Sequence, residues 1–134
     1  MEDRLARLFA SPYVQRLDVR YDGHGDELTC ILPYKDALVG NPLIPALHGG
    51  AIGAFMEITA SAGLMAATDL AALPKPIDVA VDYLRPARPS DVYARAAITR
   101  QGSRVANVRV EAWQERRAAP IATLHGHFLV KPAG

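Results

Sequence analysis

One carboxylate stands alone in a long, weakly polar stretch of this chain. Between Gly49 and Thr68, Glu57 is the only residue charged at neutral pH. An unpaired, ionised carboxylate is costly to bury, so such groups are retained mainly where they are paired or where chemistry needs them. Glu57 is therefore a candidate general base or nucleophile. The alternative is a Glu exposed at one edge of a core helix.

Two glycines after His48 could supply the other half of a site. If Gly49 and Gly50 form the first turn of a helix, their N–H groups lack intrahelical acceptors and carry the positive end of the helix dipole. Glycine lets a carbonyl oxygen approach the backbone, and one such donor is typically worth about 10²–10³ in rate. Glu57 lies about 10 Å further along the helix at 1.5 Å per residue. We therefore expect Glu57 of one subunit to face Gly50 of another in a symmetric dimer.

Other catalytic signatures are missing from the sequence, which has no G-x-S-x-G elbow, P-loop or G-x-G-x-x-G. His125 and His127 share one face of a predicted strand, but no third metal ligand is evident near them, so we expect exposed or interface histidines. A carboxylate with backbone donors suits a thioester, because a thiol with a pKa near ~8.5 leaves with little acid assistance.

The glycine-led stretch is predicted to be one long helix over residues 49–70. At 100° per residue, Ile52, Phe55 and Met56 fall on one side, and Gly53, Glu57 and Leu64 fall roughly opposite. Because the opposite side is small and apolar, we expect a sheet on one side and another subunit on the other. A membrane span is disfavoured, since an acid at its centre costs about 3 kcal/mol.

The rest of the chain predicts a sheet around this helix. A short helix is expected over residues 2–10, a hairpin of strands over 14–21 and 27–32, and an irregular loop over 35–47. After Pro76 the period changes to two, which indicates antiparallel strands. The first of these places Ile77, Val79, Val81 and Tyr83 on one face. This order indicates an α+β domain with one curved antiparallel sheet covering a single helix.

Composition limits the partners of the protein. The 134 residues have the length of one domain, and 15 Lys and Arg against 14 Asp and Glu give a net charge of +1. Such a balance provides no whole-chain field to attract nucleic acid or an anionic membrane. The single cysteine, Cys30, excludes an intrachain disulfide. With no apolar signal segment at the N-terminus, we expect a cytoplasmic protein.

Two motifs in the expected order resemble the PaaI-like branch of the hotdog-fold acyl-CoA thioesterases, the 4HBT superfamily. The first is Leu-His-Gly-Gly-Ala at residues 47–51 with an acid, Glu57, nine residues after the His. The second is IDVAVDYLRPA at residues 77–87. The similarity runs from about residue 41 to 130. It implies a single hotdog domain over residues 1–134, in which six antiparallel strands wrap one long central helix.

The resemblance also implies site residues. Glu57 would be the nucleophile or general base, Gly50 the backbone donor to the thioester oxygen, and His48 the residue that orients this turn. Asn41 resembles an asparagine that helps to hold the attacking water. Many members have Asp where this chain has Glu57.

Further residues are expected around the substrate. Gly49 and Tyr83 are expected in the substrate or coenzyme A (CoA) site. Arg85 and Arg88 either meet CoA phosphates or are solvated turn residues.

The sequence is thus interpreted as a homodimeric or homotetrameric acyl-CoA thioesterase with sites at the subunit interface. It would release a carboxylic acid and free CoA, require no dissociable cofactor or metal, and bind neither nucleic acid nor membrane. The first alternative is a non-catalytic acyl-CoA binding or regulatory protein on the same scaffold. A hotdog hydratase or dehydratase is disfavoured, because the helix carries no separate Asp/His pair. The acyl group stays open.

Overall fold

The computed structural model describes residues 2–24 and 27–134. Three α-helices and a short 3₁₀ turn are present: α1 Glu2–Phe9, α2 Pro12–Leu17, η1 Asp36–Leu38 and α3 Gly49–Ala67. The strands are β1 Arg20–His24, β2 Glu27–Leu32, β3 Val39–Asn41, β4 Ala46–Leu47, β5 Lys75–Tyr83, β6 Val92–Gln101, β7 Val105–Trp113 and β8 Ala122–Leu129.

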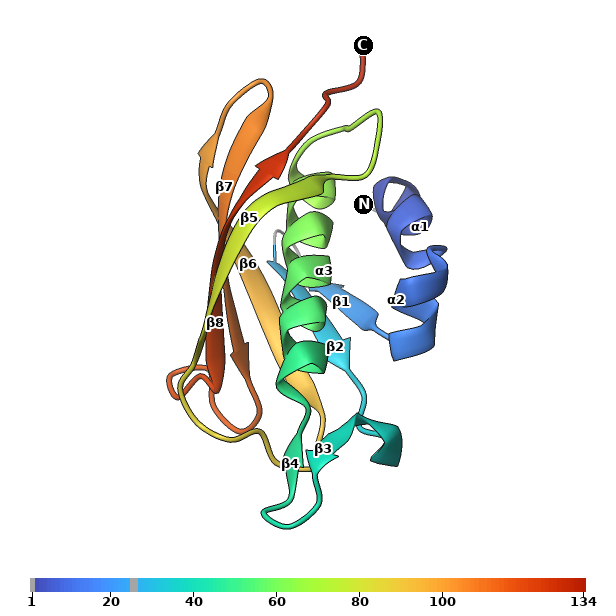
Figure 1. Ribbon diagram of the computed structural model, residues 1–134. Helices are drawn as coiled ribbons and strands as arrows, with labels where there is room; N and C mark the ends of the chain where they lie inside the picture. Colours follow the sequence, from blue (N-terminus) through green and yellow to red (C-terminus); the bar gives the residue numbers. More distant parts are fainter. Residues whose placement is uncertain (1, 25–26) are drawn as a thin grey trace.

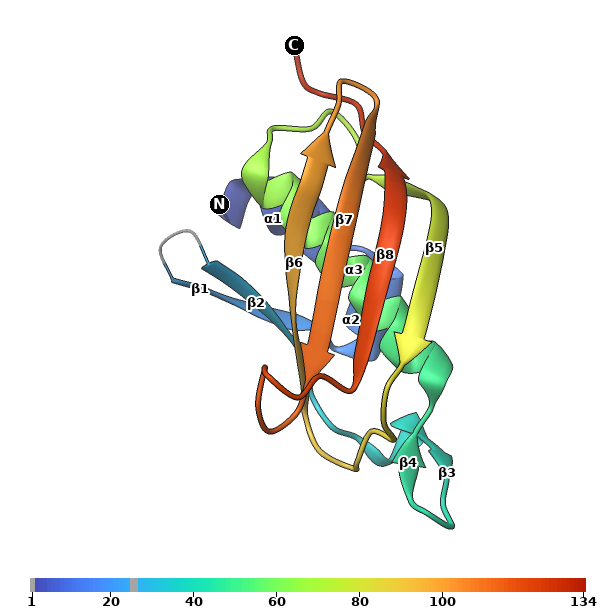
Figure 2. The same cartoon turned by 90° about the vertical axis from the view of Figure 1, so that its left-hand side faces the viewer.

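A six-stranded antiparallel sheet in the order β1-β2-β6-β7-β8-β5 wraps around α3 (Figures 1 and 2). The separate β3–β4 hairpin leads directly into the helix. Alternating apolar residues build the inner face of the central strands, as the period of two predicts: Ala106, Val108, Val110 and Ala112 of β7 are all buried. The predicted α+β fold, a curved sheet around one long helix, is confirmed.

Helix α3 forms the core because small residues let it approach the sheet. A Cβ added at Gly63 would lie 2.9 Å from the Cβ of Ala96 in β6, closer than side chains normally pack. Phe55, Met56 and Leu64 are fully or almost fully buried. The helix is long and apolar enough to cross a bilayer, but 56% of its most apolar window is buried within the domain, as in the core helix of a folded domain. It ends at Ala67, three residues before the predicted end.

The prediction of a strand over residues 14–21 is wrong for residues 14–19, and only its last two residues lie in a strand. Pro12 occupies the first turn of α2, where its missing N–H costs nothing, and Val14 packs inward from this helix. Asp18 ends α2 in the left-handed conformation with φ of 64°. The strand β1 therefore begins only at Arg20. The spacing of Val14 and Leu17 fits one face of a helix, and the chain forms this helix instead of the strand that we predicted from residues 14–21.

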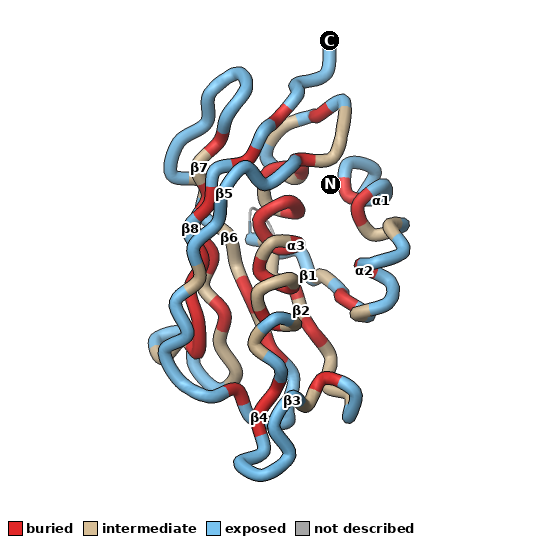
Figure 3. The backbone as a smooth tube through the Cα atoms, viewed as in Figure 1, coloured by how far each residue is buried: buried red, intermediate tan, exposed pale blue. Residues whose placement is uncertain are grey.

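Helices α1 and α2 cover the C-terminal half of the α3 side that was expected to face a partner (Figures 1 and 3). Leu5 is fully buried, and so is Leu64 on that side of α3. Arg7 donates to the carbonyl oxygens of Ala71 and Leu70 at 2.7 and 3.0 Å. The expectation of a partner along the whole helix is thus corrected, because the chain itself covers half of it.

What is left uncovered is a stripe on the first half of α3, formed by Gly50, Gly53, Ala54 and Glu57. We call it the α3 stripe. The first of these residues is exposed and the others are half-buried. The side chains that follow on the same side of the helix, Ser61 and Leu64, are buried. The stripe therefore covers about two helical turns.

Strand β5 lies at one edge of the sheet, so its inner face is poorly covered. Val79 and Tyr83 are 37% and 54% exposed. Pro76 pairs with Phe128 and Asp78 with His127, which leaves Ile77 out of the register. The expected single face of Ile77, Val79, Val81 and Tyr83 is thus broken by a bulge at Ile77.

Candidate functional site

The β3–β4 hairpin and η1 fix the start of α3. The His48 N–H donates to the Leu38 carbonyl at 2.7 Å, and the Leu47 N–H donates to the Ala87 carbonyl at 2.9 Å. Gly40 lies against His48, where an added Cβ would come within 2.9 Å of the His48 Cα. A side chain at position 40 would therefore push the His48 backbone away. These contacts hold the turn that contains the two glycines.

His48 caps α3 through its side chain. Its Nδ1 accepts a hydrogen bond from the Gly50 N–H at 3.0 Å, and its carbonyl accepts from Ala51 and Ile52 at 3.1 and 3.3 Å. Because Nδ1 accepts, the neutral ring carries its proton on Nε2. His48 therefore orients this turn, but it also occupies the N–H that the sequence assigned to an oxyanion.

Gly49 is the remaining glycine of this first turn. Within residues 2–24 and 27–134, the Gly49 N–H donates no hydrogen bond, as expected for the first N–H of a helix. To donate to a thioester oxygen, the Gly50 N–H must either share its hydrogen between two acceptors or lose its hydrogen bond to His48. The Gly49 N–H can donate without any such change. Residue types and spacing do not indicate this difference, because it depends on the orientation of the His48 ring.

Tyr83 lies across the same turn from β5. Its hydroxyl donates to the Gly49 carbonyl at 2.7 Å. The ring lies 3.4 Å from the position of a Cβ at Gly49, and its hydroxyl oxygen is 3.3 Å from that position at Gly53. Tyr83 and Gly49 also line a mainly apolar cavity with Leu47, Ile52 and the segment 84–87. The predicted substrate residues Gly49 and Tyr83 are thus in contact.

Glu57 lies half-buried on the α3 stripe. Desolvation by burial raises the pKa of its carboxyl above the ordinary value. In the described part of the chain, no hydrogen bond or ion pair reaches this carboxylate. The seven residues from Gly50 span about 10 Å of helix. In one chain, the residue that carries the carboxylate and the amide donors are therefore separated by about two turns of helix.

Asn41 ends β3 and has a local partner. Its Oδ1 accepts a hydrogen bond from the Leu43 N–H at 3.0 Å, which stabilises the tip of the β3–β4 hairpin. The side chain of the next apolar residue, Leu43, is 93% exposed. Within one chain, the described contacts do not join Asn41 to Glu57, so its expected role with water stays a prediction.

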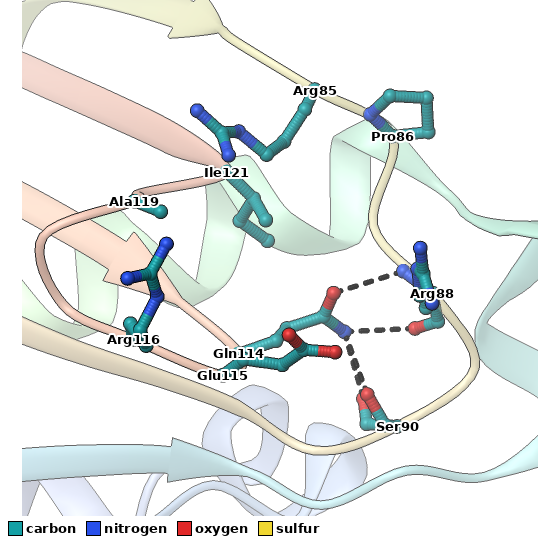
Figure 4. A pocket seen from close by; sticks show the side chains of 9 residues that line it. All are labelled: Arg85, Pro86, Arg88, Ser90, Gln114, Glu115, Arg116, Ala119 and Ile121. Atoms are coloured by element: carbon teal, nitrogen blue, oxygen red, sulfur yellow. Dashed lines mark hydrogen bonds between the residues drawn. The ribbon is translucent and has the colours of Figure 1, made fainter.

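Arg85 and Arg88 lie in the connection between β5 and β6, and Arg85 also lines the cavity at Gly49. Both line a pocket with Ser90, Gln114 and Arg116 (Figure 4). Sequence reasoning missed the last two, because they come from the β7–β8 connection and only the fold brings them near Arg85. The pocket shares Arg85, Pro86 and Ile121 with the cavity at Gly49.

The remaining candidates lie on the outer face of the sheet or in the core. His127 Nδ1 lies 2.7 Å from the Asp78 Oδ1 on the outer face of the sheet, and His125 is a second exposed histidine there. Among the described residues, no three His, Cys, Asp or Glu side chains are grouped to hold a metal. Burial raises the pKa of the Cys30 thiol to about 12, so this thiol is not a nucleophile near neutral pH.

Solved structures with similar folds include close sequence relatives. A protein from Chromobacterium violaceum is 40% identical, with a TM-score of 0.76 over 97% of this chain and 93% of that chain. A protein from Pseudomonas aeruginosa is 32% identical, with a TM-score of 0.82 over 95% and 96%. A putative thioesterase from Ralstonia eutropha JMP134, a phenylacetic acid degradation-related protein, is 23% identical with a TM-score of 0.79 over 95% and 99%, and shows the fold alone.

Family-level comparison agrees with this fold. No curated protein matches the sequence. The family model of the thioesterase superfamily, 4HBT, matches residues 45–121, which include the glycine turn, Glu57 and the strands β5 to β7. The chain therefore belongs to the thioesterase superfamily and has its hotdog fold.

Proposed function

We propose that the protein is an acyl-CoA thioesterase, in which Glu57 activates water or attacks the thioester directly. The observation that carries the proposal is the unpaired Glu57 carboxylate on the α3 stripe. Membership of the thioesterase superfamily supports acyl-thioester hydrolysis in general. Water and the thioester give a carboxylic acid and the free thiol, so no dissociable cofactor is required.

The first turn of α3 would stabilise the developing oxyanion. Gly50 is the donor that the sequence indicates, and Gly49 is its unengaged neighbour in the described structure. Backbone donors at a helix N-terminus are fixed before the reaction and need little reorganisation as charge develops. His48 would be a positioning residue that holds Gly50 in place.

A second copy of the chain would complete the site. The uncovered α3 stripe continues into β5, because Tyr83 contacts both Gly49 and Gly53. Strand β5 also has a free edge and exposes the apolar side chain of Ile77 by 56%. Free strand edges and apolar patches favour association. In such a homodimer, or a homotetramer built from it, Glu57 of one subunit faces the glycine turn of the other.

The test is thiol release from a panel of aliphatic and aromatic acyl-CoAs by the wild type and by Glu57→Gln. The amide keeps the size of the side chain but removes the base, so the rate should fall by about 10² or more. Exposed Glu2→Gln on α1 is the matched control and should keep the wild-type rate. Equal rates for Glu57→Gln and the wild type would refute the role of Glu57. Acyl-CoA binding without any turnover would instead indicate a binding protein.

A further inference from the structure

Three arginines surround one pocket at the end of the sheet where α3 begins. Arg85 and Arg88 come from the β5–β6 connection, and Arg116 comes from the β7–β8 connection (Figures 1 and 4). The cavity measures about 180 Å³. A water molecule takes about 30 Å³ of liquid, so phosphate-sized groups fit in this space.

Gln114 ties the two connections together. Its side-chain oxygen accepts from the Arg88 N–H at 2.9 Å, and its Nε2 donates to the Arg88 carbonyl at 2.8 Å. The same nitrogen lies 3.1 Å from the Ser90 Oγ. From the other side, the Arg85 N–H donates to the Ile121 carbonyl at 3.2 Å. The backbone that carries Arg85 and Arg88 is therefore held in place without a ligand.

The charge of this pocket is not balanced. Elsewhere Arg20, Arg95 and Arg117 each have a carboxylate partner at 3.4 to 3.7 Å. Across residues 2–24 and 27–134, no carboxylate lies within ion-pair distance of Arg85, Arg88 or Arg116. Glu115 also lines the pocket, so three positive charges stand against one negative charge. Guanidinium groups in excess favour a polyanion, and they bind phosphate oxygens in pairs.

The pocket is continuous with the candidate active site. It shares Arg85, Pro86 and Ile121 with the apolar cavity that is lined by Gly49 and Tyr83. A ligand with phosphates at one end and an uncharged arm at the other can therefore reach from the arginines to the first turn of α3. An acyl-CoA has this chemistry, because its nucleotide phosphates are joined to the thioester by an uncharged pantetheine arm.

We propose that Arg85, Arg88 and Arg116 bind the phosphate groups of the CoA nucleotide, and that the pantetheine arm lies in the cavity at Gly49 and Tyr83. The assignment rests on the proposed function for the identity of the ligand. It adds Arg116 as a specificity residue and makes the nucleotide part of substrate recognition. Thioesters that lack the nucleotide are then poor substrates.

The first experiment measures binding of adenosine 3′,5′-bisphosphate by isothermal titration calorimetry and needs no turnover. Arg88→Ala and Arg116→Ala should each weaken binding about tenfold or more, because each removes charge-assisted hydrogen bonds. The matched control is Arg117→Ala, next in the chain, whose guanidinium pairs with Glu111 at 3.6 Å. It should bind like the wild type. Equal weakening by Arg116→Ala and Arg117→Ala, or no binding to the wild type, overturns the proposal.

The second experiment compares an acyl-CoA with the matching acyl-pantetheine thioester. Arg116→Ala should raise KM for the acyl-CoA about tenfold with kcat unchanged, and should leave kcat/KM for the acyl-pantetheine thioester unchanged. A similar loss on both substrates would show a structural effect and refute the assignment. Nucleotide binding with no thiol release from any substrate would refute the proposed hydrolysis and leave the phosphate pocket standing.

Discussion

The close approach of α3 to β6 can be tested with Gly63→Ala. In most helix interiors this change stabilises a protein, because alanine is about 0.5–1 kcal/mol more favourable than glycine. Here the new Cβ would lie 2.9 Å from the Ala96 Cβ, and neither methyl group can rotate away. Overpacking of this kind costs about 1–3 kcal/mol. The free energy of unfolding should therefore fall by about 1 kcal/mol net.

A double-mutant cycle isolates this contact. Ala96→Gly removes the opposing methyl group, so combining it with Gly63→Ala should recover about 1–2 kcal/mol relative to the sum of the single changes. Ala97→Gly is the matched control, because Ala97 is an exposed neighbour in the same strand. It should not rescue Gly63→Ala. Urea unfolding at one fixed protein concentration measures all of these variants, since association would change the midpoint.

A Gly63→Ala variant that is more stable than the wild type would contradict overpacking at this contact. Such a result would mean that the helix and the sheet separate at little cost. Helix α3, which carries the α3 stripe, would then be held less rigidly than the burial of its other residues implies. Rescue by Ala97→Gly as well as by Ala96→Gly would show that the strand, not the contact, sets the stability.

Four further predictions concern the site and the core. Burial raises the pKa of Glu57. In a plot of kcat/KM against pH, the apparent pKa of the acidic limb should therefore lie above the ordinary Glu value, and this limb should be absent in Glu57→Gln. The same shift favours the protonated carboxyl in the folded state, so Glu57→Gln should be more stable than the wild type at neutral pH, a gain that disappears below the unfolded-state pKa. His48→Ala removes the cap on the Gly50 N–H and should cost about 1 kcal/mol in urea unfolding; an unchanged midpoint would contradict the cap. Cys30, with its pKa raised to about 12, should react with a thiol reagent at pH 8 only in denaturant, and rapid labelling of the native protein would contradict its burial.

The fold was predictable because its strongest signals are local. The change to a period of two after Pro76 and the long apolar segment around Glu57 each determine an element with little help from the rest of the chain. The strand prediction for residues 14–21 was largely wrong, since Val14, Leu17 and Val19 fit part of a helix as well as part of a strand. The proline at position 12 was the signal that decided for the helix.

The site was harder to predict because it depends on three-dimensional placement. That His48 would occupy the Gly50 N–H follows from one side-chain orientation, which no spacing in the sequence records. Arg116 joins Arg85 only because β5 and β8 are neighbours in the sheet. The exposure of Val79 and Tyr83 follows from the edge position of β5, which a pattern of alternation does not reveal.

The two N-terminal helices have a consequence for how copies of this chain can meet. Helices α1 and α2 cover the C-terminal half of one side of α3. They leave only the α3 stripe, a window of about two helical turns, open to a second copy. In the proposed homodimer, two such windows would overlap fully in a single alignment, and sliding by one turn would lose about half of the contact. In the proposed homodimer, the N-terminal segment would thus select the alignment of the two helices, although none of its residues lies in the candidate site.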